Sequence, residues 1–206
     1  MPYADLTIAL AGSLDYGGVA RGPTDPWVHL LVDQELAREA RLSDVTALRL
    51  HVEARVTECR RDRQAQYLPA IHAAQVPLFI SIQNRNPASP GFGDYYHLGI
   101  PVFDNRERMS GGLVVGDPGT GKLMYCPPAA TWTSASTHGG KWVTFSGDLL
   151  PEALCGLQAA WARGFLTDSS DISDYRPAGI CVGWEVPGVF DAACQFWGLS
   201  LRAVVR

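Results

Sequence analysis

The segment Leu48-Arg49-Leu50-His51-Val52-Glu53-Ala54-Arg55-Val56 alternates apolar and polar residues without a break. This period of two is typical of a half-buried β-strand, because successive side chains of a strand point to opposite faces of the sheet. The apolar residues of the segment would face a core. The residues of the opposite face would be Arg49, His51, Glu53 and Arg55.

Two later segments repeat the same alternation. Residues 75–83 place four aliphatic residues on one side and Gln75, Phe79, Ser81 and Gln83 on the other. Pro77 has no backbone N–H to donate, which indicates a strand start, an edge strand or a bulge. Residues 95–106 place Tyr95 and His97 on one face, while Leu98 and Ile100 would join the core.

Turn residues and short strands together predict an all-β fold. The 206 residues include 21 Gly and 14 Pro, and about nine short strands alternate with turn signals. Residues 149–165 carry the one convincing helical pattern, with Asp148 as its predicted cap. We therefore expect one domain over residues 1–206, a two-sheet antiparallel sandwich whose helix covers one end of the core. The last two strands, 179–186 and 192–205, are expected to form a hairpin.

Composition excludes several classes of function. The net charge of −4 leaves no general basic surface, so nucleic acid is not an expected partner. No apolar run reaches the roughly 18 residues of a membrane-spanning helix. The apolar run at residues 6–11 has no Lys or Arg before it, unlike a signal peptide, so the default expectation is a cytoplasmic protein.

Cysteine usage gives no framework of disulfides or metal ligands. The chain has five cysteines, an odd number, and no pair has the CxxC spacing. Cys181 and Cys194 flank the predicted last hairpin and could pair, but buried free thiols are the simpler interpretation. We expect no metal and no cofactor.

Two further motifs have structural explanations. Gly116-Asp117-Pro118-Gly119-Thr120-Gly121-Lys122 has the glycine spacing of a P-loop, but Leu123 stands where a hydroxyl residue would reach magnesium. Pro127 and Pro128 also prevent the helix that a P-loop requires, so a hairpin turn is expected. Asp168, Asp171 and Asp174 lack the spacing of a calcium loop, and we expect them to form turns and caps.

The polar faces of the predicted strands supply the candidate ligand-binding site. If all these faces meet, the site consists of Arg49, His51, Glu53, Arg55, Gln75, Gln83, Tyr95, His97 and Glu185. Planar polar groups of this kind bind sugar hydroxyls, and the aromatic residues Phe79, Tyr95 and Trp184 could cover the apolar face of a sugar ring. The alternative without a ligand is a solvated face whose side chains form cross-strand ion pairs.

Two catalytic versions of the site remain open. Glycoside hydrolysis needs two carboxylates about 5–10 Å apart, for which Glu53 and Glu185 form the candidate pair. Polysaccharide β-elimination needs a group that neutralises a uronate, with a base and an acid beside it. Arg49 or Arg55 with Gln83 would neutralise the uronate, and His97 and Tyr95 would transfer the protons.

Two segments resemble a known group of proteins. Residues 141–149, Lys-Trp-Val-Thr-Phe-Ser-Gly-Asp-Leu, are similar to the penultimate region of galactose-binding-like jelly rolls, and Phe196-Trp197-Gly198-Leu199-Ser200-Leu201 resembles their last strand. The resemblance covers about a third of the chain and implies a jelly-roll sandwich of the carbohydrate-binding-module type. Such modules often hold a structural calcium through acidic residues of the last strand, where this chain has Trp197 and Gly198.

The sequence therefore predicts a non-catalytic carbohydrate-binding, or related ligand-binding, jelly roll whose partner is a carbohydrate or another small polar ligand. A polysaccharide lyase or glycoside hydrolase that uses the same face is the first alternative. A structural or protein-interaction sandwich is the second. The sequence leaves open whether the chain is an enzyme and what its oligomeric state is.

Overall fold

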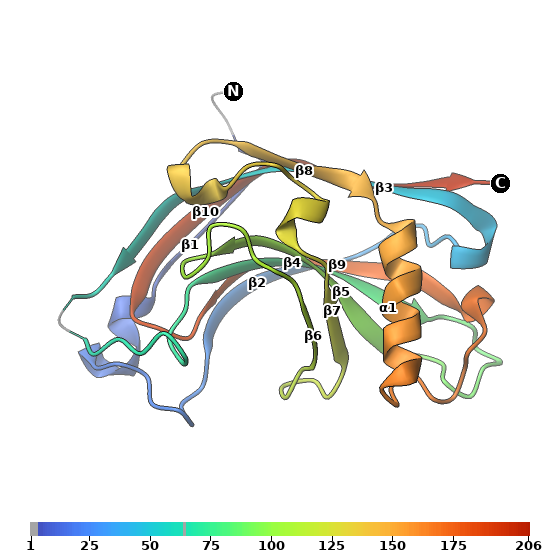
Figure 1. The fold of residues 1–206 in the computed structure, drawn as a ribbon, viewed down its shortest axis with the longest axis horizontal. Helices are drawn as coiled ribbons and strands as arrows, with labels where there is room; N and C mark the ends of the chain where they lie inside the picture. Colours follow the sequence, from blue (N-terminus) through green and yellow to red (C-terminus); the bar gives the residue numbers. More distant parts are fainter. Residues whose placement is uncertain (1–3, 64) are drawn as a thin grey trace.

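Two β-sheets and one α-helix form the fold (Figure 1). The computed structural model describes residues 4–63 and 65–206. Sheet A has four strands in the order β1 (Leu6–Ala11), β10 (Phe190–Val205), β3 (Val45–Arg61) and β8 (Val143–Asp148). Sheet B has six strands in the order β2 (Val28–Glu35), β9 (Tyr175–Val186), β4 (Gln75–Asn84), β5 (Tyr95–Asp104), β7 (Leu123–Cys126) and β6 (Leu113–Gly116).

Helical structure is scarce. The α-helix α1 spans Leu150–Ala162, within the predicted range 149–165. Single 3₁₀ turns are η2 (Leu42–Asp44), η3 (Ala129–Thr131), η4 (Thr137–Gly139) and η5 (Ile172–Asp174), and η1 (Gly12–Gly18) joins two such turns across a kink. The named strands pair antiparallel except β5 and β7, which are parallel. The predicted fold class, a two-sheet β jelly-roll sandwich with one main helix, is confirmed.

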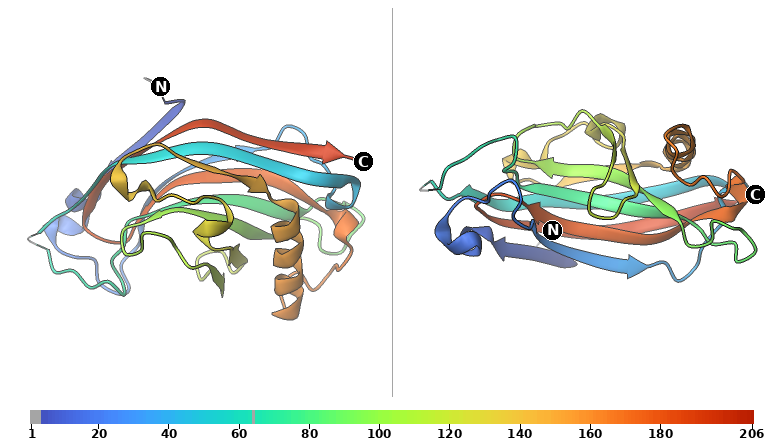
Figure 2. Two further views of the ribbon diagram at one scale, coloured as in Figure 1. Left: turned by 45° about the horizontal axis from the view of Figure 1, so that its top comes forward. Right: turned by 90° about the horizontal axis from the view of Figure 1, so that it is seen from below.

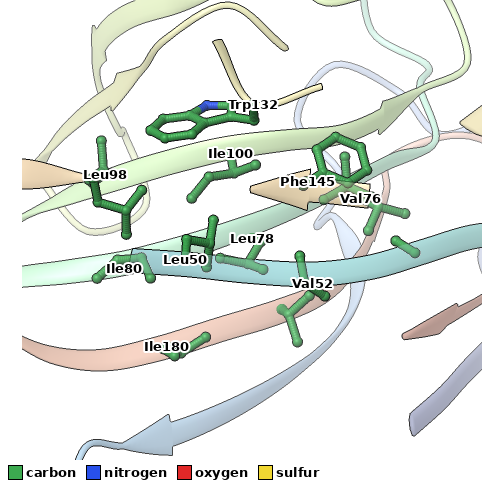
Figure 3. Close-up of a cluster of buried hydrophobic side chains, with 14 of the residues drawn as sticks. Leu50, Val52, Val76, Leu78, Ile80, Leu98, Ile100, Trp132, Phe145 and Ile180 are labelled. Atoms are coloured by element: carbon green, nitrogen blue, oxygen red, sulfur yellow. The ribbon is translucent and has the colours of Figure 1, made fainter. Parts of the chain in front are cut away.

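The core lies between the two sheets and follows from the alternation. On β4, the aliphatic residues from Val76 to Ile82 are fully buried, whereas the residues between them are half-buried. They pack against the apolar face of β3, which includes Leu50 and Val52 (Figure 3). Burial of this apolar surface is the main favourable term of folding.

Pro77 marks a bulge and not an edge. β4 lies between β9 and β5, inside sheet B. The pairing register with β5 shifts by one residue between Val76 and Pro77. A bulge leaves a residue outside the ladder, which lets the missing N–H of proline fit an interior strand.

The predicted hairpin of the last two strands is wrong. β9 belongs to sheet B and β10 to sheet A, so the chain crosses from one sheet to the other between Val186 and Phe190. Both strands bury one apolar face in the same core, and two strands of that kind can pair side by side or face each other. Cys181 and Cys194 accordingly lie on different sheets, and both are free thiols.

Helix α1 extends the covering layer beyond the edge of sheet A. Asp148, the predicted cap, lies one residue before the N-cap position, and its Oδ1 accepts hydrogen bonds from the backbone N–H groups of Leu48 (2.8 Å) and Leu150 (3.1 Å). This carboxylate therefore ties the start of the helix to β3. The helix packs on β5, where the Tyr96 hydroxyl donates to the carbonyl oxygen of Ala153 at 2.7 Å.

Gly156 allows this close approach between α1 and β5. A Cβ at residue 156 would lie 2.5 Å from the Tyr96 hydroxyl oxygen and 2.5 Å from a carbon of its ring. Gly156→Ala gains about 1 kcal/mol in helix propensity, but overpacking costs about 1–3 kcal/mol. We expect urea unfolding to show a net loss of stability of about 1–2 kcal/mol. Cys155→Ala, at an exposed position of the same helix, is the control and should change little; a Gly156→Ala variant more stable than wild type would contradict this packing.

Both sheets curve in the same sense, and the hollow side of sheet B faces away from sheet A (Figure 1). We call this side the concave face. It carries the side chains of sheet B that alternate with the core residues, from Gln75 to Gln83 on β4 and at Tyr95 and His97 on β5. We call the solvent side of sheet A the outer face.

Candidate functional site

The nine candidate residues divide between the two sheets. Gln75, Gln83, Tyr95, His97 and Glu185 belong to β4, β5 and β9 and lie on the concave face. Arg49, His51, Glu53 and Arg55 all belong to β3 and lie on the outer face. The expectation of one shared face is therefore wrong for the β3 residues, because the core of the sandwich separates them from the others.

This separation removes both catalytic assignments made from the sequence. Glu53 and Glu185 lie on opposite sides of the sandwich and cannot flank one glycosidic bond. Neither Arg49 nor Arg55 can reach a uronate held by Tyr95 and His97. On the outer face, Arg55 donates to the Gln195 Oε1 at 2.7 Å and lies 4.8 Å from the centre of the Trp142 ring.

Trp184, proposed as a sugar-stacking residue, is instead part of the core. Its side chain is 0% exposed, and its Nε1–H donates to the carbonyl oxygen of Ile8 on β1 at 3.2 Å. Since side chains alternate along β9, the burial of Trp184 turns Glu185 to the concave face.

Three rings meet on the concave face, and we call Phe79, Tyr95 and His97 the ring cluster. The centre of the His97 ring lies 5.2 Å from that of Phe79 and 5.1 Å from that of Tyr95. His97 Nδ1 is buried and has no hydrogen-bond partner. Burial lowers the pKa of His97, against the opposing charges of Asp117 and Asp33, so the imidazole is neutral near pH 7.

Gly99 makes room for this cluster. A Cβ at residue 99 would lie 2.3 Å from the Cys126 Sγ and 3.1 Å from the Phe79 ring. Glycine inside a strand often marks a place where another group approaches the backbone closely. Here the groups are a thiol and a ring, which form a continuous surface across β4, β5 and β7.

A cavity of about 210 Å³ lies beside the ring cluster. Tyr95, Ser81 and Gln83 line it on one side, and Asp33 and Gly179 are among the residues on the other. Ser81 stands between Gly179 and His97 in the strand register. The cavity is therefore a recess of the concave face, with an aromatic wall, amide and hydroxyl groups, and acidic residues of β2.

The two glutamines of the candidate set already have partners. Gln75 Nε2 donates to the Asp104 Oδ2 at 2.8 Å, and Gln83 Nε2 donates to the Gly93 carbonyl oxygen at 2.8 Å. Gln83 Oε1 also accepts from Arg85 at 3.3 Å. These bonds fix the orientation of the two amides. Each glutamine can therefore offer a ligand only the hydrogen-bond donors and acceptors that are still free.

Glu185 is a carboxyl group of the concave face whose pKa is raised. Burial raises its pKa, the charge of Asp117 raises it further, and His29 acts in the opposite direction. Burial also raises the pKa of the nearby Cys126 thiol to about 11, with the charge of Glu185 contributing. A carboxyl group that keeps its proton at higher pH than usual can act as a general acid.

Asp117 was missed as a candidate because its segment was assigned to a turn. That assignment is confirmed, since β6 and β7 form an antiparallel hairpin around it. Its carboxylate accepts hydrogen bonds from Gly119 N at 3.0 Å and from Thr120 N and Oγ1 at 3.0 and 2.6 Å. Burial raises the pKa of Asp117, but these hydrogen bonds outweigh it and leave the pKa below its usual value. Its charge acts on both Glu185 and His97, so the hairpin turn faces the concave face.

Asp33 was also missed, because β2 does not alternate cleanly: Leu30, Leu31 and Val32 follow one another. It pairs with Cys181 in the strand register, and burial followed by a hydrogen bond to Asp33 raises the pKa of that thiol to about 12. Asp171 has the capping role expected of the aspartates at residues 168–174, whereas Asp174 also accepts a hydrogen bond from the distant Asn86. Asp171 caps η5 by accepting from Ser173 N, and Asp174 accepts from the Ser169 hydroxyl.

Solved structures to which this chain is similar include glycoside hydrolases of family 12. The endoglucanase Cel12A from Rhodothermus marinus is 13% identical, with 86% of this chain and 75% of that chain covered and a TM-score of 0.45. A family 12 xyloglucanase from Bacillus licheniformis is 10% identical, with 89% and 78% covered and a TM-score of 0.47. The xyloglucanase domain of NopAA from Sinorhizobium fredii, in complex with cellobiose, is 12% identical, with 89% and 80% covered and a TM-score of 0.41.

No family model and no curated protein matches the sequence. Among the described residues, no helix has the length and apolar character needed to cross a membrane. Within the same residues, no group of three or more His, Cys, Asp or Glu side chains could hold a metal ion.

Proposed function

We propose that this protein binds a glycan along the concave face of sheet B and hydrolyses a glycosidic bond there, with Glu185 as the general acid. The observation that carries the proposal is the placement of two carboxyl groups on this face, Glu185 on β9 and Asp117 in the turn between β6 and β7, beside the ring cluster. Their surroundings also shift their pKa values in opposite directions. Glu185 is desolvated and inclined to keep its proton, whereas the hydrogen bonds of Asp117 favour its ionised form. Such a division is the usual basis for assigning the acid and the base of a carboxylate pair.

The proposed reaction uses each group in its favoured state. Glu185 donates its proton to the glycosidic oxygen as the bond from that oxygen to the anomeric carbon breaks. Asp117 supplies the negative charge that stabilises the positive anomeric carbon, and it accepts a proton from the attacking water. The ring cluster offers apolar surface for a sugar ring, and the cavity beside it offers polar groups for the hydroxyls.

A screen of substrates tests the proposal. Wild-type protein is incubated with a panel of soluble polysaccharides that includes β-1,4-glucan, xyloglucan, xylan and polyuronates, and release of reducing ends is measured. We expect release from at least one polymer. If a polymer binds and no reducing ends appear under any condition of pH, the hydrolase proposal fails and binding alone remains.

Phe79 is expected to contribute to binding through its ring. Phe79→Ala removes apolar surface next to His97. The Kd for a bound oligosaccharide should rise about tenfold, equivalent to a loss of about 1.4 kcal/mol in binding free energy. Isothermal titration calorimetry measures the change. Trp197→Ala is the aromatic control, since Trp197 pairs with Glu53 on the outer face. An equal loss in both variants would place the ligand elsewhere.

Glycan binding without turnover is the second candidate, and one observation favours it. Both carboxylate oxygens of Asp117 already accept hydrogen bonds within their own turn. A base with its lone pairs occupied is less able to take a proton from water. In that case the protein would be a binding module of the kind to which residues 141–149 and 196–201 are similar.

A further inference from the structure

Strand β2 is a free edge of sheet B. Among the described residues it pairs only with β9, and it lies at one margin of the molecule (Figure 2). Its pairing runs through all eight residues without a register shift, and the strand contains no Lys and no Pro. Natural edge strands usually carry a bulge, a Lys or a Pro, because a regular free edge can pair with another strand.

The hydrogen-bonding groups that face outward on β2 can be identified. The backbone N–H of Leu36 donates to the Ala178 carbonyl oxygen at 2.9 Å, which continues the register of β2 with β9. In an antiparallel ladder, alternate residues direct both backbone groups to the same neighbour. The even-numbered residues of β2 therefore bond to β9, and the odd-numbered residues His29, Leu31, Asp33 and Glu35 direct their N–H and C=O groups to the free edge.

Two apolar side chains beside this edge are exposed. Leu30 is 43% exposed and Val32 is 41% exposed. Both pair with core residues of β9, namely Trp184 and Val182, so they lie on the core side of sheet B but beyond the cover of sheet A. An apolar strip along a free strand edge is a common site of pairing between chains.

We propose that β2 pairs antiparallel with β2 of a second copy of this chain, around a twofold axis at Leu31. Pairing of the outward groups of His29, Leu31 and Asp33 gives about six backbone hydrogen bonds. In this register His29 lies opposite the partner's Asp33, and Leu30 lies opposite the partner's Val32. The twofold symmetry repeats each of these contacts, as in the isologous interface of a homodimer.

The apolar residues select this register over the one with the axis at Val32. With the axis at Val32 the outward groups could also pair, and His29 would lie opposite the partner's Glu35, so a carboxylate faces His29 in both registers. Leu31, however, would then lie opposite the partner's Asp33 and Leu30 opposite the partner's Gln34. Apolar pairs across strands stabilise a sheet, whereas an apolar residue facing a carboxylate does not. With the axis at Leu31, Leu30 and Leu31 both lie opposite apolar residues of the partner.

The pairing would join two copies of sheet B into one continuous sheet. Because Asp33 also lines the cavity of the concave face, the two cavities would lie on the same side of this sheet, one on each side of the new seam. A glycan chain could then contact both copies. The pairing itself rests on the free edge and does not depend on the proposed hydrolysis.

Sedimentation equilibrium on the whole chain tests the pairing. Wild-type protein should show a concentration-dependent mass that rises from 22.3 kDa to about twice that value. His29→Asp places like charges opposite each other and should weaken the association at least tenfold, and Asp33→Lys should weaken it as well. The double variant H29D/D33K places opposite charges across the seam and should return the dissociation constant to within about threefold of wild type.

A cross-linking variant gives a second readout that does not depend on these charges. Leu31→Cys, combined with Cys155→Ser to remove the exposed native thiol, should form a covalent dimer on mild oxidation, because the two Cα atoms at the axis would be about 5.5 Å apart. Glu35→Cys in the same background is the control and should not cross-link. Circular dichroism confirms that each variant is folded.

Three results would overturn the proposal. The first is a wild-type protein that stays monomeric up to several hundred micromolar. The second is an association that His29→Asp leaves unchanged, which would place the interface elsewhere. The third is a mass that continues to rise beyond two copies, which an isologous pair of edges does not permit.

Discussion

Glu185→Gln is expected to abolish most of the hydrolysis while leaving the glycan bound. The amide has nearly the same shape as the carboxyl group but has no acidic proton to give to the leaving oxygen. General acid catalysis contributes about 10²–10⁴-fold, so kcat should fall by that factor while the Kd changes by less than about threefold. The measurement combines reducing-end assays with calorimetric titration of the variant.

Glu53→Gln is the matched control for this variant. It makes the same chemical change on β3, on the outer face, where the core separates it from the proposed substrate. Its kcat should equal that of wild type. A Glu185→Gln variant that keeps wild-type kcat, or equal losses in both variants, would contradict the role of Glu185.

The pH profile provides an independent check on the protonation state. Burial and the charge of Asp117 raise the pKa of Glu185, so the group stays protonated to higher pH than an ordinary glutamate. The reaction requires the protonated form, and kcat should fall as pH rises through this pKa. Any residual activity of Glu185→Gln should lack this alkaline decline.

The strands were predictable because each signal is local. Alternation along residues 48–56 and 75–83 depends only on which side chains point into the core, and both segments form strands with the expected faces. The helix was predictable for the same reason. The supposed hairpin of β9 and β10 failed because alternation does not tell which sheet a strand joins.

The candidate site shows the same limit more sharply. Each polar residue was correctly placed on the side of its strand away from the core, but a sandwich has two such sides. His51 and His97 have the same local pattern, yet they lie on the outer face and on the concave face. Asp117 reaches the concave face from a turn, a long-range arrangement that has no periodic signal in the sequence.

Replacement of Trp184, the neighbour of Glu185 on β9, is expected to lower the stability of the fold. Trp184→Ala should reduce the free energy of unfolding by about 3–5 kcal/mol, the usual cost of removing a large buried aromatic side chain. The indole is 0% exposed, packs edge-on against the ring of Phe103 at 5.7 Å, and joins the sheets through its hydrogen bond to Ile8. Thermal and urea unfolding of the variant measure the loss.

Two comparisons make this result interpretable. Phe92→Ala removes an aromatic side chain that is 55% exposed and should change stability by about 0.5 kcal/mol or less. Glu185→Gln should also unfold close to wild type, because its change lies on the concave face. If Trp184→Ala were as stable as Phe92→Ala, the indole would not be part of the core. The assignment of Glu185 to the concave face would then fail as well, because the two side chains are on opposite sides of one strand.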